Sequence, residues 1–205
     1  MWENLGGYNK PDRVKQREIS KRKAADYFND NWDRVEKVKS WLYDEKSRII
    51  YENLNSDEVF VDCGGYTADT TLDFVNRTKS KGYKRIITFE PDPKLSDVIK
   101  KNIEPYDNIV YIPKGVYSIT GNLYFDSDGT SGGTFLKNEN ANHNGNKVKV
   151  EVTKIDDVPE CTDATYIKMD LEGSEWDALH GAEKTILCQK PKLGIYVSTI
   201  LMKIE

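Results

Sequence analysis

Four short runs of apolar residues, each followed by glycine or polar residues, dominate the pattern of the chain between residues 57 and 197. The runs have strand length and are nearly continuous in apolar residues, which is typical of strands buried on both faces of a parallel sheet. The four predicted strands are Val59–Asp62, Arg85–Glu90, Tyr166–Asp170 and 190–197. A helix-forming segment follows the first and the third of them. The pattern therefore predicts an α/β fold with a mostly parallel sheet and flanking helices.

Residues 108 to 155 show a different pattern. We expect a third strand over Asn108–Ile112, a turn over Gly115–Ser118 and a short strand over Asn122–Asp126. Residues 126–146 are too rich in Gly, Asn and Ser to pack a core, whereas Lys147–Ile155 alternates valine with charged residues, as a half-buried antiparallel strand does. The predicted result is a hairpin with a long polar tip. Such a tip is either a lid or binding loop at a ligand site or plain disorder.

Residues 1–56 form a predicted helical arm ahead of a domain over residues 57–205. The arm carries 12 basic and 10 acidic side chains and the rest of the chain carries 18 and 24, so the arm is the more basic part. Seven basic residues between Lys10 and Lys23 could meet an anionic glycan or a nucleic acid, but no aromatic residue is interleaved to stack on bases. We therefore expect a solvated helix face and no nucleic-acid partner. The apolar residues at helical spacing that predict the arm's helices are Trp32, Val35, Val38, Leu42, Ile49 and Ile50.

Length, cysteine content and hydropathy narrow the class of protein. The chain has 205 residues and no apolar stretch of about 18 residues, so we expect a soluble chain without a membrane span. Its first residues show no basic segment followed by an apolar one, as a secretory signal would. Cys63, Cys161 and Cys188 lack metal-ligand spacing, so we expect neither a disulfide framework nor a zinc site, and a cytoplasmic location fits. His143 and His180 show no partner for a role as catalytic base.

Residues 59–71, reading VFVDCGGYTADTT, carry the most specific chemistry of the chain. The strand ends at Asp62 and runs into Gly64, Gly65 and a helix start, which places backbone N–H groups around a pocket at the sheet edge. A dinucleotide fingerprint would need glycine where this chain has Tyr66 and Asp69. S-adenosylmethionine has no pyrophosphate; it needs a carboxylate for its ammonium group and one close backbone approach, which Asp62 and Gly64 can supply. The alternative is a buried strand followed by a glycine turn of no function.

A carboxylate ends the second predicted strand. Glu90 is followed by Pro91 and Pro93, which stop the strand. A carboxylate at this tip is placed to accept hydrogen bonds from two ribose hydroxyls. The alternative is a solvent-facing strand end.

Three carboxylates follow the strand 166–170. Asp170 and Glu172 are predicted to share a face at its carboxyl end, and Glu175 lies in the first turn of the next helix, for which Ser174 is the predicted N-cap with Asp177 three residues on. Methyl transfer to a hydroxyl usually needs a base, and Asp170, Glu172 and Glu175 are the candidates. The same carboxylates offer the hard oxygen ligands that Mg²⁺ accepts, but nearby carboxylates alone do not define a metal site, and none is assigned.

The segments DCGGYTADTT, FEPDP and KMDLEGSEWDALHGA, followed by KPKLGIYV, together resemble the FkbM-type S-adenosylmethionine-dependent methyltransferase family over residues 57–197. The resemblance implies a Rossmann-like class I methyltransferase fold, S-adenosyl-L-methionine as cofactor and, as acceptor, a hydroxyl of a sugar, glycan or natural product. It implies that Val116 lies near adenine and that Asp170 and Glu172 border the transferred methyl. The predicted cofactor-binding residues are Asp62, Gly64, Gly65, Tyr66, Thr67, Asp69, Thr70, Glu90, Pro91, Asp92, Gly115, Val116 and Asp170.

The chain departs from the family pattern at Ala68 and at its C-terminal end. Ala68 stands where relatives usually have glycine, which is accommodated if the backbone there is already helical. The family continues with further strands after LGIYV, so we expect a sheet incomplete at its C-terminal strands, with Ile195, Val197, Ile200 and Leu201 exposed and self-association through the open edge.

The alternative function is a catalytically impaired S-adenosylmethionine-binding relic or binding module. Gly64→Val is expected to block the cofactor and leave the protein folded.

Overall fold

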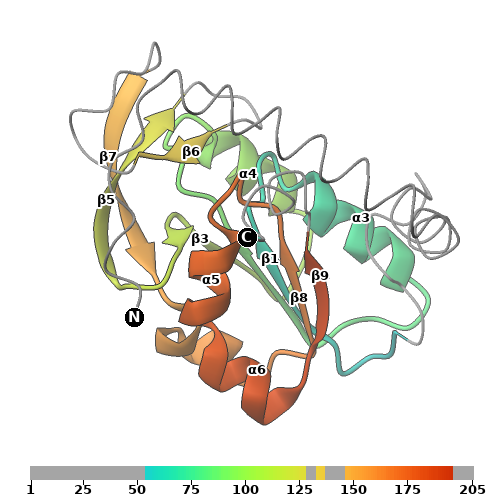
Figure 1. The fold of residues 1–205 in the computed structure, drawn as a ribbon. Helices are drawn as coiled ribbons and strands as arrows, with labels where there is room; N and C mark the ends of the chain where they lie inside the picture. Colours follow the sequence, from blue (N-terminus) through green and yellow to red (C-terminus); the bar gives the residue numbers. More distant parts are fainter. Residues whose placement is uncertain (1–53, 128–132, 137–145, 196–205) are drawn as a thin grey trace, which may run out of the picture. The chain divides into compact units, whose positions relative to one another are not determined.

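A computed structural model describes residues 54–127, 133–136 and 146–195 of the chain (Figure 1). The chain divides into two compact units, one of residues 49–198 and one of residues 1–48 and 199–205. Every described residue belongs to the first unit. The helices predicted for the arm, and Val197, Ile200 and Leu201, lie outside the described residues.

Within the described residues, five parallel strands form the main sheet in the order β3-β2-β1-β8-β9 (Figure 1). The prediction of an α/β fold with a parallel sheet and flanking helices is confirmed. The strands are β1 (Val59–Cys63), β2 (Arg85–Phe89), β3 (Ile109–Ile112), β8 (Tyr166–Met169) and β9 (Lys192–Ile195). The helices are α3 (Asp69–Thr78), α4 (Ser96–Ile103), α5 (Glu175–Gly181) and α6 (Glu183–Gln189).

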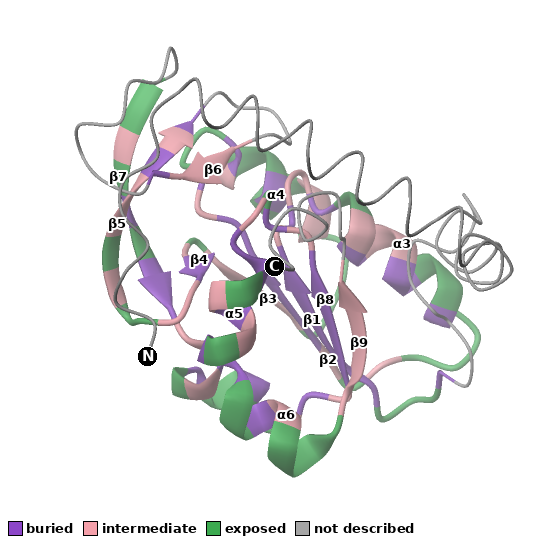
Figure 2. Cartoon of the chain, viewed as in Figure 1, coloured by how far each residue is buried: buried purple, intermediate pink, exposed green. Residues whose placement is uncertain are grey.

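Different helices cover the two faces of the main sheet, which explains why its strands are apolar without alternation. On one face, Val61 and Ile167 share a core with Ala178 of α5. On the other face, Phe60 stacks on Phe74 of α3 with 4.3 Å between the ring centroids. Figure 2 shows the inner strands β1, β2 and β8 largely buried and the outer strands β3 and β9 at intermediate burial. The three inner strands therefore form the buried middle of the main sheet.

A second sheet has the order β4-β7-β5-β6 within the described residues. Its strands are β4 (Gly115–Val116), β5 (Gly121–Ser127), β6 (Thr134–Phe135) and β7 (Asn146–Thr153). The predicted hairpin is confirmed in the antiparallel pairing of β5 and β7, and two 3₁₀ helices, η1 (Ile155–Asp157) and η2 (Pro159–Cys161), then lead to β8.

Two predictions for this region are wrong. The residues Gly115 and Val116, predicted as a turn, form a strand parallel to β7. Part of the polar run forms β6, because Phe135 has a large apolar surface to bury and packs its ring 5.3 Å from that of Phe125.

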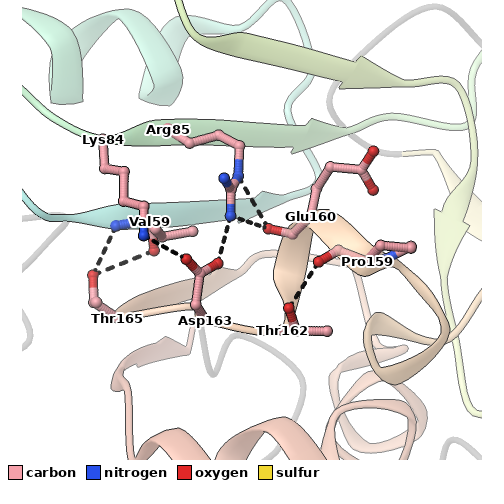
Figure 3. Close-up of polar contacts among 8 residues, drawn as sticks. All are labelled: Val59, Lys84, Arg85, Pro159, Glu160, Thr162, Asp163 and Thr165. Carbon is pink, nitrogen blue, oxygen red and sulfur yellow. Dashed lines mark hydrogen bonds and ion pairs between the residues drawn. The ribbon is translucent and has the colours of Figure 1, made fainter.

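Polar contacts close the end of the main sheet at which the strands begin (Figure 3). The Lys84 ammonium lies 2.8 Å from Oδ2 of Asp163, and the Arg85 guanidinium donates to the Asp163 carboxylate and, at 2.9 Å, to the carbonyl of Glu160. The Val59 N–H donates to Oγ1 of Thr165 at 2.9 Å. These bonds tie the starts of β1 and β2 to the segment before β8, so the polar groups at this end serve the fold.

The opposite end of the sheet contains a reversal of strand order. The chain builds outward from β1 through β2 to β3 and later places β8 on the other side of β1. In α/β sheets, ligands bind beyond the carboxyl ends of the strands at such a reversal. Gly64, directly after β1, has φ of +82°, and a Cβ there would lie 2.1 Å from the carbonyl oxygen of Asp170. The expectation that Gly64→Val leaves the protein folded is therefore contradicted, since the added carbons would meet the chain itself.

Gly64→Ala tests this packing against a matched control, Gly82→Ala. Gly82 also has positive φ, +80°, but nothing lies within 4 Å of a Cβ there, so its substitution should cost only the conformational penalty of about 1–2 kcal/mol. Gly64→Ala should cost about 4 kcal/mol or more, because a backbone carbonyl must also move. Urea denaturation measures both free energies of unfolding. Equal losses in the two variants would contradict the close packing of Gly64.

Candidate functional site

Three loops meet at the carboxyl end of the main sheet, after β1, β2 and β8. They are residues 64–68, 90–95 and 170–174. The Tyr66 N–H donates to Oε2 of Glu90 at 2.9 Å, and the Asp170 N–H donates to the Cys63 carbonyl at 3.1 Å. The glycine turn, the carboxylate at the tip of β2 and the acidic loop after β8 therefore form one cluster.

Glu90 has both carboxylate oxygens engaged. Oε2 accepts from the Tyr66 N–H and Oε1 accepts from the Asp92 N–H, each at 2.9 Å. The side chain is 7% exposed. This burial raises the pKa of Glu90 to about 7, although the two backbone donors oppose the shift. Glu90 thus fixes the turn after β1 relative to β2.

Asp62 has no exposed surface with which to meet a ligand's ammonium group, contrary to the prediction. Its Oδ2 accepts from Oγ1 of Thr71 at 2.8 Å, and its Oδ1 lies 3.1 Å from Nζ of Lys168. The register of β1 and β8 places Asp62 directly beside Lys168. Burial acts to lower the pKa of Lys168, but the charges of Asp62 and Asp170 outweigh it and raise that pKa. Asp62 therefore acts on the site through the structure of the turn.

Left-handed residues alternate with others along the turn. The angle φ is +82° at Gly64, +48° at Tyr66 and +66° at Ala68. The condition under which alanine is accommodated there, a helical backbone, is not met, because Ala68 lies in the left-handed region that favours glycine. Its buried methyl group packs with Leu95 and Ile99, which offsets part of a conformational cost of about 1–2 kcal/mol.

The last predicted residues of the turn lead into α3. The Thr67 carbonyl accepts from Nδ2 of Asn102 in α4 at 2.8 Å. Asp69 is exposed in the first turn of α3 and Thr70 is half-buried. The N-cap residue, Ala68, has no side-chain oxygen to satisfy the first N–H groups of the helix. These donors are suited to a ligand carboxylate.

The small sheet is attached to two of the three loops. Oδ1 of the buried Asp92 accepts from Oγ of Ser127 at 2.8 Å, and Nζ of Lys94 donates to the Ser127 carbonyl at 2.7 Å. From β6, Oγ1 of Thr134 donates to the Glu172 carbonyl at 3.2 Å. The small sheet therefore contacts the loops after β2 and β8, which flank the turn after β1.

Gly115 and Val116, predicted to contact the cofactor, are both buried. A Cβ on Gly115 would lie 2.2 Å from Cζ of Phe135. Val116 has no exposed surface and packs in the main core. Its side chain therefore offers nothing to an adenine ring in this structure. Pro91, also predicted here, is half-buried.

Glu175 is a structural carboxylate rather than a free base. It is 2% exposed, and its Oε1 accepts from the N–H groups of Leu171 at 3.0 Å and Gly173 at 3.2 Å. Ser174 is the N-cap of α5 by position but makes no side-chain capping bond, contrary to the prediction. Oγ of Ser118 instead donates to Oδ1 of Asp177 at 3.2 Å. The loop after β8 is thus shaped by Glu175.

Asp170 and Glu172 are the two carboxylates of this loop with exposed surface. Asp170 is half-buried and Glu172 is exposed. Partial burial, followed by the charges of Asp170 and Glu175, raises the pKa of Glu172. A higher pKa makes Glu172 a stronger base than an ordinary glutamate.

Two residues of this cluster escaped the sequence interpretation. Thr88 lies beside Asp62 in the register of β1 and β2, and a Cβ on Gly65 would lie 2.2 Å from its Oγ1, which explains the second glycine of the turn. Lys168 carried a signal, because it interrupts a buried apolar strand just as Asp62 does. Opposite charges in two buried strands are expected to pair.

Other reactive side chains lie elsewhere in the described part of the chain. No group of three or more His, Cys, Asp or Glu among those residues is placed to hold a metal ion. Cys63 and Cys161 are buried free thiols, while Cys188 and His180 line an open depression of about 460 Å³ beside α6 and η1. None of the described helices combines the length and the apolar character needed to cross a membrane.

Comparisons with known proteins identify the family of the chain. A search of curated proteins gives no match. A solved structure, the crystal structure of methyltransferase FkbM from Methylobacillus flagellatus KT, is similar with a TM-score of 0.55 and 25% sequence identity; the match covers 72% of this chain and 36% of that one. The family model of the methyltransferase FkbM domain matches residues 62–203. The resemblance drawn from the motifs is thereby confirmed, and the chain belongs to the FkbM methyltransferase family.

Proposed function

We propose that this chain binds S-adenosyl-L-methionine at the carboxyl end of its main sheet and transfers the methyl group to a hydroxyl oxygen of a sugar, glycan or natural product. The strand order β3-β2-β1-β8-β9 supports a Rossmann-like class I methyltransferase fold with the cofactor turn after the central strand. The observation that carries the proposal is the carboxylate of Glu90, which is bonded to that turn from the tip of the neighbouring strand.

The geometry of Glu90 suits a ligand with two adjacent hydroxyl groups. Each carboxylate oxygen already accepts one backbone N–H and retains a second acceptor direction. A ribose presents two hydroxyl donors side by side. Because the backbone donors hold the carboxylate in place, little side-chain entropy is lost when a ligand binds.

The charges at this end of the sheet favour a cationic cofactor over one with a pyrophosphate. The loops carry the four carboxylates of Glu90, Asp92, Asp170 and Glu172 and one cation, Lys94, which donates to the Ser127 carbonyl. The charge of Lys168 is buried and paired with Asp62. Sulfonium and ammonium groups are attracted to an acidic surround, and a pyrophosphate is repelled by it. A nicotinamide-dependent enzyme is disfavoured for this reason and because Tyr66 and Asp69 occupy glycine positions of the dinucleotide fingerprint.

When bound, S-adenosylmethionine supplies a methyl group that is electrophilic because it is attached to a sulfonium sulfur. The chain has to hold an acceptor oxygen in line with that methyl group and to accept the hydroxyl proton. We assign the acceptance of this hydroxyl proton to the Glu172 carboxylate, whose pKa is raised. Thr134 holds the Glu172 carbonyl, and Glu175 holds the loop that carries Glu172.

The small sheet is the proposed acceptor side of the site. Its strand β6 contacts the loop after β8 through Thr134. The partly exposed ring of Phe135, also in β6, lies 5.5 Å from the partly exposed ring of Tyr117. Partly exposed aromatic surface suits an acceptor with an apolar face, such as a sugar or a polyhydroxylated natural product.

Glu90→Ala should weaken S-adenosylmethionine binding by at least about tenfold, because a hydrogen bond to a charged group contributes about 1.5–3 kcal/mol. Calorimetric titration measures the affinity, and Glu104→Ala, at the exposed end of α4, is the control. A folded Glu90→Ala protein with the affinity of the unchanged chain would remove the ribose assignment.

The affinity for S-adenosylmethionine should rise with pH. Ligand hydroxyls donate to the ionised Glu90, and with a pKa of about 7 the ionised fraction grows from about one tenth at about pH 6 to about nine tenths at about pH 8, so the affinity should grow about ninefold. Glu90→Gln cannot ionise and should lose this slope. Titrations across this pH range measure it, and an equal slope in both proteins would assign the effect to another group.

Glu172→Gln should reduce methyl transfer by about 100-fold or more while leaving cofactor affinity within about threefold, because the acceptor proton loses its base. Transfer of labelled methyl groups to a panel of glycan and small-molecule hydroxyls measures the rate. Glu183→Gln, an exposed acidic residue in α6, is the control. If Glu172→Gln retains its rate and Asp170→Asn does not, Asp170 is the base.

A further inference from the structure

We propose that Lys168 is a positioning residue that sets the shape of the cofactor turn from beneath. The inference rests on the proposed function, since the turn it acts on is the proposed cofactor turn. In the proposed reaction Lys168 contacts neither the cofactor nor the acceptor. It acts through the backbone of Gly64 and the carboxylate of Asp62.

Lys168 belongs to a row of polar residues inside an apolar sheet. The registers of the three central strands place Thr88, Asp62 and Lys168 side by side. The next row toward the strand starts is apolar and contains Val61 and Ile167. Asp62 is fully buried and Lys168 is 3% exposed, so both charges have left water. Such burial is costly unless each charge has partners of good geometry.

The contacts of this pair hold both ends of the turn. Nζ of Lys168 donates to the Gly64 carbonyl at 2.7 Å, at the start of the turn. The same Nζ lies 3.1 Å from Oδ1 of Asp62, whose Oδ2 accepts from Oγ1 of Thr71 at 2.8 Å in the first turns of α3. A chain of polar contacts thus runs from Gly64 through Lys168 and Asp62 to Thr71. The turn and the start of α3 lie between Gly64 and Thr71.

The N–H and the carbonyl of Gly64 are both hydrogen-bonded to neighbouring strands. The Gly64 N–H donates to the Phe89 carbonyl of β2 at 3.0 Å, while its carbonyl accepts from β8 through Lys168. The turn residues Tyr66 and Ala68 have positive φ, a conformation that persists only when the surroundings impose it. Lys168 supplies one of the fixed points that impose it.

Stability alone does not explain the pair. A buried ion pair can generally be replaced by neutral side chains of similar volume without loss of stability, whereas removing one partner leaves an uncompensated charge. The pair therefore has a function beyond stability if its neutral replacement folds well but binds cofactor poorly. This difference separates a positioning role from a purely structural one.

The experiment compares Lys168→Met with the double variant Asp62→Asn/Lys168→Met. Lys168→Met alone should show a large fall in melting temperature, because Asp62 is left buried and unpaired. The double variant should recover most of the melting temperature, since both groups are now neutral. Its affinity for S-adenosylmethionine, by calorimetric titration, should stay at least about tenfold below that of the unchanged chain, because the Gly64 carbonyl has lost its donor.

Lys192→Met is the matched control. Nζ of Lys192, whose side chain is 37% exposed, lies 3.1 Å from Oε1 of the buried Glu58 at the opposite end of the sheet, so the same change removes a partly exposed ion pair away from the turn. It should lower the melting temperature and leave the affinity within about threefold. A double variant that binds S-adenosylmethionine as the unchanged chain does would overturn the positioning role.

Hydrogen exchange keeps this inference separate from the proposed function. In the double variant, the amides of residues 64–68 should exchange faster than in the unchanged chain, while those of β1 and β8 keep their protection. If the unchanged chain binds no S-adenosylmethionine, the proposed function fails, and the exchange rates still report whether Lys168 orders the turn. Unchanged exchange at residues 64–68 would overturn the inference.

Discussion

The close packing of Gly64 against the carbonyl of Asp170 is the constraint on which the candidate site depends. A Cβ at Gly64 would lie 2.1 Å from that oxygen, so the chain after β1 and the chain after β8 can meet only through a glycine. Their contact brings a turn that begins about 60 residues into the chain beside carboxylates more than 100 residues later. Without it, the turn and the acidic loop would not border one site.

The polar groups around this contact serve the fold and the proposed site together. Glu90 anchors the turn through the Tyr66 N–H and keeps acceptor capacity for a ligand, at the cost of burial that raises its pKa to about 7. Lys168 and Asp62 neutralise each other beneath the turn, and Asp170 and Glu172 are the carboxylates with exposed surface on the loop after β8. The small sheet then joins the loops on both sides. Binding and stability are thus coupled, and variants have to be designed to separate them.

Much of the fold and of the site's location could be predicted because the responsible signals are local. Strands such as β1 and β8 are buried on both faces, so their sequences are apolar runs that end where the turn residues begin. Parallel strands bring their carboxyl ends to one side of a sheet, which places Glu90, Asp170 and the glycine turn together. Strand β6 was not predicted, because Thr134 and Phe135 stand within a polar run and the Phe135 ring packs against rings that lie elsewhere in the chain.

The sequence by itself determined the strands of the main sheet, their parallel arrangement, the family and the three segments that border the candidate site. Only the tertiary structure decided what each polar side chain does there. Asp62 and Glu175 have the residue type expected of ligand-binding or catalytic groups, yet both are buried and bonded within the protein. Lys168 looked like an isolated charge until the register of β1 and β8 paired it with Asp62. The physical reason is that burial and hydrogen-bond partners depend on contacts between residues far apart in the chain, which no local pattern records.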